Sequence, residues 1–164
     1  MNKFATIKLS KEYLKFSSAH FTIFSSSERE RLHGHNFAVS AKFKAPVDNN
    51  GLCFNYGDLK YKLSVLCQTL DEYILLPGES PHLVIERSAE NYLIQFNKER
   101  MQFLVSDTLI LPLKNISVEE LAGYLLSKLL IDPDLQKADI SMIEVSVSSG
   151  PGQWGARSWS AENE

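Results

Sequence analysis

The stretch from Phe16 to Phe37 reads FSSAHFTIFSSSERERLHGHNF, and its pattern decides how the surrounding chain can fold. Residues 8–24 mix β-branched and aromatic side chains without a helical stripe, which indicates a strand. Residues 35–47 alternate apolar side chains with polar or small ones, and the apolar positions are Phe37, Val39, Ala41 and Phe43. A polar connection, SSSERERL, separates the two runs. The stretch therefore predicts a long antiparallel hairpin.

Three of the four histidines lie on this hairpin at spacings that suit metal ligands. In a strand, His33 and His35 point to the same side, and Gly34 between them leaves the opposite face open. His20 lies on the preceding strand and closes a three-nitrogen site if the register is right. Three imidazoles without a fourth protein ligand are typical of catalytic zinc. The alternative is a set of hydrogen-bonded histidines, because H-x-H alone is a weak signal, and His82 in a loop fits that alternative better.

The composition is that of an ordinary globular protein. A length of 164 residues with 44% hydrophobic and 23% charged residues predicts one folded domain over residues 1–164. A net charge of −3 with scattered Lys and Arg argues against nucleic acid as a partner. No apolar run suits a membrane span and residues 1–16 lack a signal-peptide core, so we expect a cytoplasmic protein with no membrane partner. Two cysteines, Cys53 and Cys67, make no disulfide framework, and we expect both to be reduced.

The remaining elements follow from periodicity and from capping signals. Apolar residues recur at helical spacing from Asp58 onward, at Leu59, Leu63, Leu66, Cys67 and Leu70. A second helix begins at Ser117, which forms a capping box with Glu120. Short apolar runs predict strands at Leu83–Glu86, Tyr92–Asn97, Met101–Ser106, Thr108–Pro112 and Met142–Ser148, the first four as further hairpin strands. This order predicts an α+β fold, with an antiparallel sheet and two helices packed on one face.

Several motifs together resemble a known family. The segments FSSAH and ERLHGHNF are similar to the F-x-A-A-H and L-H-G-H-N/S-Y/F strands of the 6-pyruvoyltetrahydropterin synthase and 6-carboxytetrahydropterin synthase family. The likeness continues in order through NNGLCFNYGDLK, LDEYILLP, LPLKNISVEELAGYL and VSVSSGPGQW, and so covers nearly the whole chain. The resemblance implies a T-fold whose trimers form a barrel and stack in pairs into a hexamer, with sites at subunit interfaces. It also implies that His20, His33 and His35 bind zinc and that the substrate is a pterin, 7,8-dihydroneopterin triphosphate.

The position of Glu30 resembles that of a glutamate subfamily. The usual family base is a cysteine just before L-H-G-H, whereas this chain has the pattern E-x-x-H-G-H with Glu30 three residues ahead of His33. That subfamily is associated with side-chain cleavage to 6-hydroxymethyl-7,8-dihydropterin. A carboxylate can serve as a general base if burial raises its pKa from about 4.3 toward neutrality. The alternative is a solvated glutamate that pairs with Arg29 or Arg31.

The chain departs from the family at two other positions. Asp71 matches the aspartate of a family L-D-H motif, but Glu72 or Tyr73 stands where its catalytic histidine is expected. Glu119 matches a retained glutamate at the second helix. At the end of the last strand, Ser149 replaces a glutamate that accepts two N–H groups of the pterin.

These features predict a zinc-dependent pterin lyase with Glu30, Asp71 and Glu72 as catalytic residues and Glu119 and Ser149 at the substrate. The alternative is a zinc-containing paralogue that binds a pterin-like or other heterocycle with altered or no turnover. An enzyme of the same scaffold with a new substrate is a further alternative.

Overall fold

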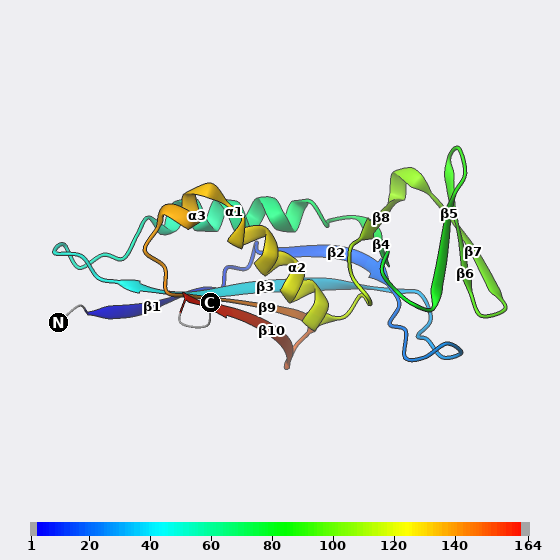
Figure 1. Cartoon of the computed structure of the whole chain (residues 1–164), viewed down its shortest axis with the longest axis horizontal. Helices are drawn as coiled ribbons and strands as arrows, with labels where there is room; N and C mark the ends of the chain where they lie inside the picture. The colour runs from blue at the N-terminus through cyan, green and yellow to red at the C-terminus, as the bar shows by residue number, and fades with distance from the viewer. Residues whose placement is uncertain (1–2, 162–164) are drawn as a thin grey trace.

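The structure is a computed structural model and describes residues 3–161 (Figure 1). The helices are α1 (Tyr56–Gln68), α2 (Val118–Leu130) and the short α3 (Pro133–Lys137), with a 3₁₀ turn at Val105–Asp107. The strands are β1 (Phe4–Leu9), β2 (Lys15–His20), β3 (His33–Pro46), β4 (Tyr73–Pro77), β5 (Leu83–Arg87), β6 (Asn91–Phe96), β7 (Glu99–Leu104), β8 (Thr108–Leu111), β9 (Met142–Gly150) and β10 (Gln153–Ser160). The predicted α+β class is confirmed.

The hairpin of β2 and β3 lies at the centre of the main sheet. The two strands are antiparallel, as predicted, with His20 opposite His33 and Ser18 opposite His35. β3 is 14 residues long, and its second half pairs with β1. The single strand predicted over residues 8–24 is therefore wrong, because the chain turns between β1 and β2 and the two strands pair with different halves of β3.

The main sheet has the strand order β10-β9-β3-β2-β4-β8, with β1 beside β3. The expectation of a purely antiparallel sheet is wrong, because β4 runs parallel to β2 and β8 runs parallel to β4. Parallel neighbours need a long crossover. Here the crossover between β4 and β8 contains β5, β6 and β7, which form a separate antiparallel sheet of three strands. β8 is thus not a hairpin strand.

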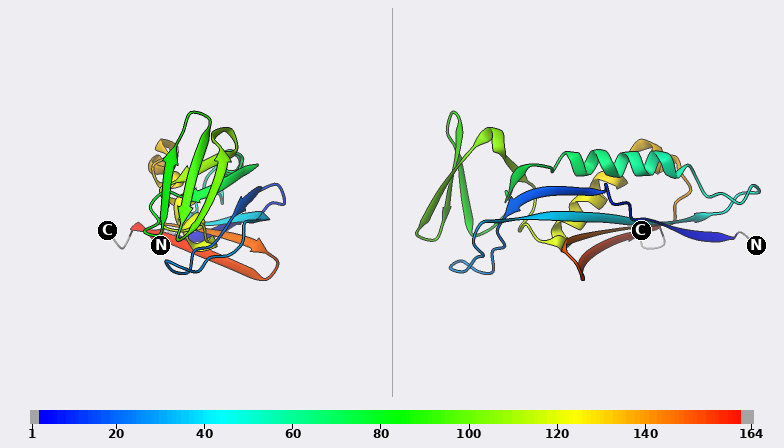
Figure 2. Two further views of the ribbon diagram at one scale, coloured as in Figure 1. Left: turned by 90° about the vertical axis from the view of Figure 1, so that its right-hand side faces the viewer. Right: turned by 180° about the vertical axis from the view of Figure 1, so that it is seen from behind.

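Both long helices cover one face of the main sheet (Figures 1 and 2). Ser117 caps α2 by accepting a hydrogen bond from the backbone N–H of Glu120 at 3.3 Å, as predicted. Only this half of the capping box forms, since Oε2 of Glu120 accepts from the N–H of Lys114. Asn55 caps α1. No helix within residues 3–161 is long and apolar enough to span a membrane.

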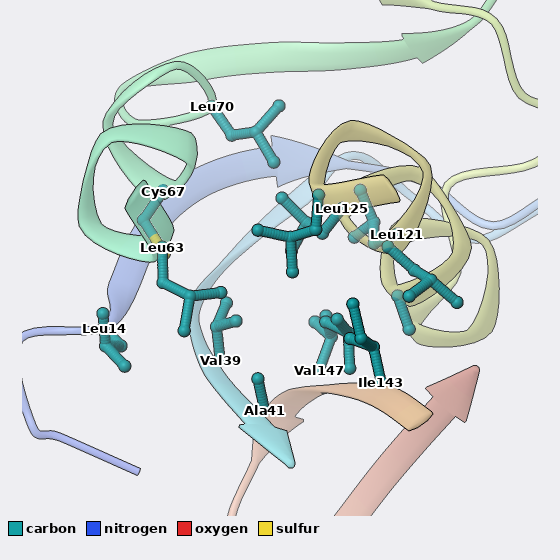
Figure 3. Close-up of a cluster of buried hydrophobic side chains, with 14 of the residues drawn as sticks. Leu14, Val39, Ala41, Leu63, Cys67, Leu70, Leu121, Leu125, Ile143 and Val147 are labelled. Carbon is teal, nitrogen blue, oxygen red and sulfur yellow. The ribbon is translucent and has the colours of Figure 1, made fainter. Parts of the chain in front are cut away.

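The main core lies between the two helices and the sheet. Figure 3 shows side chains of α1 and α2 pointing toward those of β3 and β9, among them Leu63, Cys67, Leu121, Leu125, Val39, Ala41, Ile143 and Val147. Burial of such side chains is the main stabilising contribution to the fold. Cys53 and Cys67 are both free thiols, as predicted.

A second, smaller core joins the hairpin to the three-stranded sheet, which stands at one end of the main sheet (Figure 2). Its buried members are Phe21, Ile23, Leu76, Ile94 and Phe96. Phe21 follows directly after β2, and Ile23 lies two residues further along the chain. The three-stranded sheet therefore packs against the connection that carries Glu30.

Candidate metal centre

The register of β2 and β3 brings the three hairpin histidines together. His33 lies directly opposite His20, and His35 projects from the same side of β3 two residues later. One ring nitrogen from each histidine lies within 4.8 Å of the others. The Nε2 atoms of His33 and His35 are 2.9 Å apart. This cluster has the donor set that a divalent transition metal accepts, and the predicted convergence of the three residues is what the structure shows.

His20 is the buried member of the cluster, with 5% of its surface exposed. Its Nδ1 lies 2.9 Å from the carbonyl oxygen of Ile116, which can only accept, so Nδ1 carries the proton. Burial lowers the pKa of His20, although the bond to Ile116 partly offsets this effect. Its Nε2 is the only buried side-chain nitrogen or oxygen in residues 3–161 without a hydrogen-bond partner. A neutral ring with an unpartnered Nε2 facing two imidazoles fits a metal ligand.

His33 is oriented by the backbone in the same way. Its Nδ1 donates to the carbonyl of Arg31 at 2.7 Å, so in the neutral tautomer Nε2 is the nitrogen that can bind an ion. Such hydrogen bonds to the second ring nitrogen hold metal-binding histidines in one orientation and one tautomer. The backbone therefore prepares both His20 and His33 to offer Nε2 to an ion.

Glu30 lies beside this cluster. Its Oε2 is 3.9 Å from Nε2 of His33 and accepts a hydrogen bond from the N–H of Thr22 at 3.0 Å. Burial alone raises the pKa of Glu30, but hydrogen bonds from Thr22 and the nearby His33 and His20 outweigh burial and lower it. The condition of a pKa raised toward neutrality is therefore not met, because the side chain is 38% exposed and accepts hydrogen bonds from Thr22.

The connection that carries Glu30 is held by contacts with the small core and the three-stranded sheet. Arg29 does not pair with the Glu30 carboxylate. Instead its guanidinium binds Glu99 on β7 at 2.8 Å, donates to the backbone carbonyl of Glu30 and lies over the ring of Phe21. The picture of a solvated Glu/Arg loop does not fit these contacts.

Asp71, Glu72 and Tyr73 lie beside Ser17 of β2. Oδ1 of Asp71 accepts a hydrogen bond from the N–H of Ser17 at 2.7 Å. The N–H of Glu72 donates to the carbonyl oxygen of Ser17, also at 2.7 Å. Glu72 has a φ of 64°, in the left-handed region. Glu72, Tyr73 and His35 are among the residues that line a pocket of ≈ 520 Å³. Glu72 and Tyr73 therefore share this pocket with His35, whereas Asp71, His20 and His33 do not line it.

Glu119 and Ser149 lie elsewhere in this chain. Glu119 is exposed in the first turn of α2, and Ser149 is half-buried near the end of β9. Within residues 3–161, neither side chain is hydrogen-bonded to the histidines or to Glu30.

The sequence did not predict the groups that orient His20 and Glu30. Ile116 acts through its backbone carbonyl, which any residue could supply, whereas Thr22 acts through both its backbone N–H and its side chain. Asn115 links the two segments that carry these groups, and nothing but its place before the helix cap could have drawn attention to it.

The fold and the histidine cluster define a T-fold protein with a candidate metal centre. The family model for 6-pyruvoyl tetrahydropterin synthase matches residues 8–158, and the chain belongs to this family. A Pyrococcus abyssi protein provisionally named 6-carboxy-5,6,7,8-tetrahydropterin synthase is 27% identical over 118 residues, which are 71% of this chain and 69% of that protein.

Solved structures agree with this assignment. The crystal structure of 6-pyruvoyl tetrahydropterin synthase from Plasmodium vivax superposes with a TM-score of 0.91 at 30% identity, over 97% of this chain and 99% of the other. The enzyme of Plasmodium falciparum superposes with a TM-score of 0.90 at 32% identity and the same coverage. Two further P. vivax structures, each 29% identical to this chain, carry alanine or cysteine in place of a catalytic glutamate.

Proposed function

We propose that the chain is a zinc-dependent pterin lyase that acts on the side chain of 7,8-dihydroneopterin triphosphate or a close relative. The observation that carries the proposal is the histidine cluster with an unpartnered, buried Nε2 on His20 and with Glu30 beside it. Membership of the family supports a pterin as the substrate class.

We assign the metal to Nε2 of His20, His33 and His35. Zinc accepts three imidazole ligands in catalytic sites, and two of these rings are already oriented by Ile116 and Arg31. When bound, zinc would supply Lewis acidity that lowers the pKa of the substrate's side-chain hydroxyls.

Glu30 is the proposed general base. Its lowered pKa keeps the carboxylate deprotonated but makes it a weaker base than a raised pKa would, so the proposal rests on its position beside the histidines. For cleavage to 6-hydroxymethyl-7,8-dihydropterin, it accepts the proton of the hydroxyl on the second side-chain carbon. The bond between the first two side-chain carbons then breaks, the second carbon becomes an aldehyde, and the first takes up a proton. The catalytic glutamate of the P. vivax relative supports this role.

Asp71 and Glu72 are proposed to serve as acid–base groups through the pocket that Glu72 shares with His35. Glu119 and Ser149 are proposed to face the pterin. Because Glu119 and Ser149 do not contact the histidines within one chain, we infer that the site forms between subunits of a homohexamer. Each subunit is proposed to be a single domain, and the assembly to be cytoplasmic. Light scattering in solution tests this assembly through the mass of six 18.5 kDa chains.

The decisive experiment compares two glutamates of the same connection. Glu30→Gln keeps the size of the side chain but cannot accept a proton, so we expect turnover to fall about 10²–10⁴-fold with zinc retained. Glu28→Gln is the matched control, because Glu28 is exposed and does not contact the histidines, and its turnover should match the wild type. Substrate consumption and zinc content are measured on the same samples. Equal losses in both variants, or none in either, contradict the role of Glu30.

The second candidate is a zinc-containing paralogue that binds a pterin-like heterocycle without the family reaction. It is favoured by Ser149, which replaces a charged acceptor, and by Glu72 or Tyr73 at the position expected for histidine. Assays across pterins with and without the triphosphate separate the two candidates, since only the lyase forms a product.

A further inference from the structure

Asn115 joins two segments that lie far apart in the sequence. Its Nδ2 donates to the carbonyl of Ile23 at 2.8 Å, and its Oδ1 accepts from the N–H of Ile23 at 3.1 Å. The same Oδ1 accepts from the N–H of Ile116 at 3.0 Å. One side-chain amide thus pairs with both backbone groups of Ile23, as a neighbouring strand would. Ile23 is 6% exposed and Ile116 is fully buried, so water cannot easily replace these bonds.

On the Ile23 side, the link leads to Glu30. Ile23 forms an antiparallel bridge with Arg29. The adjacent Thr22 accepts from the N–H of Glu30 at 2.8 Å and donates to its carboxylate at 3.0 Å. The position of the carboxylate therefore depends on where the backbone around Ile23 is held.

On the other side, the link leads to His20. The carbonyl of Ile116 accepts from Nδ1 of His20 at 2.9 Å, so it sets the tautomer and the direction of the ring. The N–H of that same residue is held by Asn115. The segment between β8 and α2 thereby orients the buried member of the histidine cluster.

We propose that Asn115 is a positioning residue that fixes the positions of Glu30 and His20 relative to each other. The proposal rests on the function proposed above, in which these two residues serve as base and metal ligand. Asn115 itself touches neither side chain and acts through Ile23, Thr22 and Ile116.

An asparagine is required because the position needs both a donor and an acceptor. Alanine makes none of the three bonds. Aspartate keeps the acceptor for the N–H groups of Ile23 and Ile116, but it cannot donate to the carbonyl of Ile23 and faces that oxygen with a negative charge. Asn115→Ala therefore releases both segments, whereas Asn115→Asp releases chiefly the segment that carries Glu30.

The experiment measures three properties of the full-length protein. These are hydrogen exchange of the peptide spanning residues 21–31, zinc affinity by competition with a chromophoric chelator, and the separate values of kcat and KM. For Asn115→Ala we expect exchange about tenfold faster and zinc binding about 10–100-fold weaker. We expect kcat to fall about tenfold or more, with KM changed less than about threefold. Asn115→Asp should show the same faster exchange with zinc affinity within about threefold of the wild type.

Asn55→Ala is the matched control. Asn55 caps α1 by accepting from the N–H of Gly57 at 3.0 Å and has no contact with the histidines or Glu30. Its loss should lower stability while leaving zinc affinity, kcat and exchange of residues 21–31 unchanged, so a merely structural effect can be recognised.

Native exchange and native zinc affinity in Asn115→Ala would overturn the positioning role. If Asn115→Ala does not fold, Asn115→Asp is the test. Unchanged hydrogen exchange of residues 21–31 in Asn115→Asp would then overturn the positioning role. Full turnover by Glu30→Gln would instead overturn the proposed base, and the exchange and zinc results would still report on Asn115.

Discussion

His20 behaves at once as a core residue and as a candidate ligand. Its ring makes an edge contact with Phe37, with ring centroids 5.4 Å apart, and its Nδ1 is satisfied by the backbone. A buried polar nitrogen without a partner costs about 1–3 kcal/mol. Apolar packing on one edge with an unpartnered nitrogen on the other is the arrangement expected when an ion supplies the missing interaction. The same side chain thereby ties the core of the hairpin to the site.

Ser149 offers a test of substrate recognition at the scale of one residue. A serine cannot accept two charge-assisted hydrogen bonds from the amino-pyrimidinone edge of a pterin, whereas a glutamate can. One such bond contributes about 1.5–3 kcal/mol, so we expect Ser149→Glu to bind neopterin about 10–100-fold more tightly than the wild type. Calorimetry of both proteins measures the difference.

The control for this substitution is Ser88→Glu, which adds the same charge at an exposed turn between β5 and β6. It should leave neopterin affinity unchanged. A wild type that already binds as tightly as Ser149→Glu would mean that other groups hold the pterin.

At the scale of elements, the approach of β10 to α2 depends on Gly155. A Cβ at this position would lie 2.8 Å from Cγ2 of Val118 and 2.9 Å from the backbone nitrogen of Glu119. Because part of this contact is backbone, it cannot relax by a rotamer change. We expect Gly155→Ala to lower the free energy of unfolding by about 1–3 kcal/mol in urea titrations. Gly150→Ala, which has nothing within 4 Å of the added Cβ, should cost clearly less, and equal losses would contradict the packing argument.

The elements that local patterns describe well were predictable from sequence. Alternation at Phe37 and Val39 predicted β3, and Ser117 predicted the start of α2. β10 was missed because its sequence, QWGARSWS, is largely exposed and does not alternate clearly, and its place depends on Gly155 meeting α2. The parallel pairing of β4 and β8 was missed because it depends on partners that are distant in sequence.

The candidate site divides in the same way. The histidines of the cluster follow from strand periodicity and hairpin register, which are local. The direction of the Glu30 pKa shift depends on hydrogen bonds from the side chain and the backbone of Thr22, and the orientation of His20 depends on Ile116, 96 residues away. The contact with Ile116 cannot be derived from residue type, because any residue supplies a backbone carbonyl.

At the scale of the whole molecule, the histidine cluster lies between the two hydrophobic cores. His20 contacts Phe37 of the main core and is followed by Phe21 of the small core, so an ion bound by β2 and β3 would hold the two cores together. A ligand that binds only the folded state stabilises it by RT ln(1 + [L]/Kd), about 4 kcal/mol at a thousandfold excess over Kd. For a chain of this size we therefore expect zinc to raise Tm by about 8–16 °C over chelator-treated protein.

The test is differential scanning calorimetry with zinc and with a chelator, applied to two histidine variants. His33→Ala removes one of three ligands, so its Tm should respond little to zinc. His82→Ala removes a histidine of the loop between β4 and β5, outside the cluster, and should keep the full response of the wild type. Equal zinc responses in both variants would show that the stabilising ion binds elsewhere. A loss confined to His33→Ala would tie the stability of the fold to the same three nitrogens that are proposed to serve the reaction.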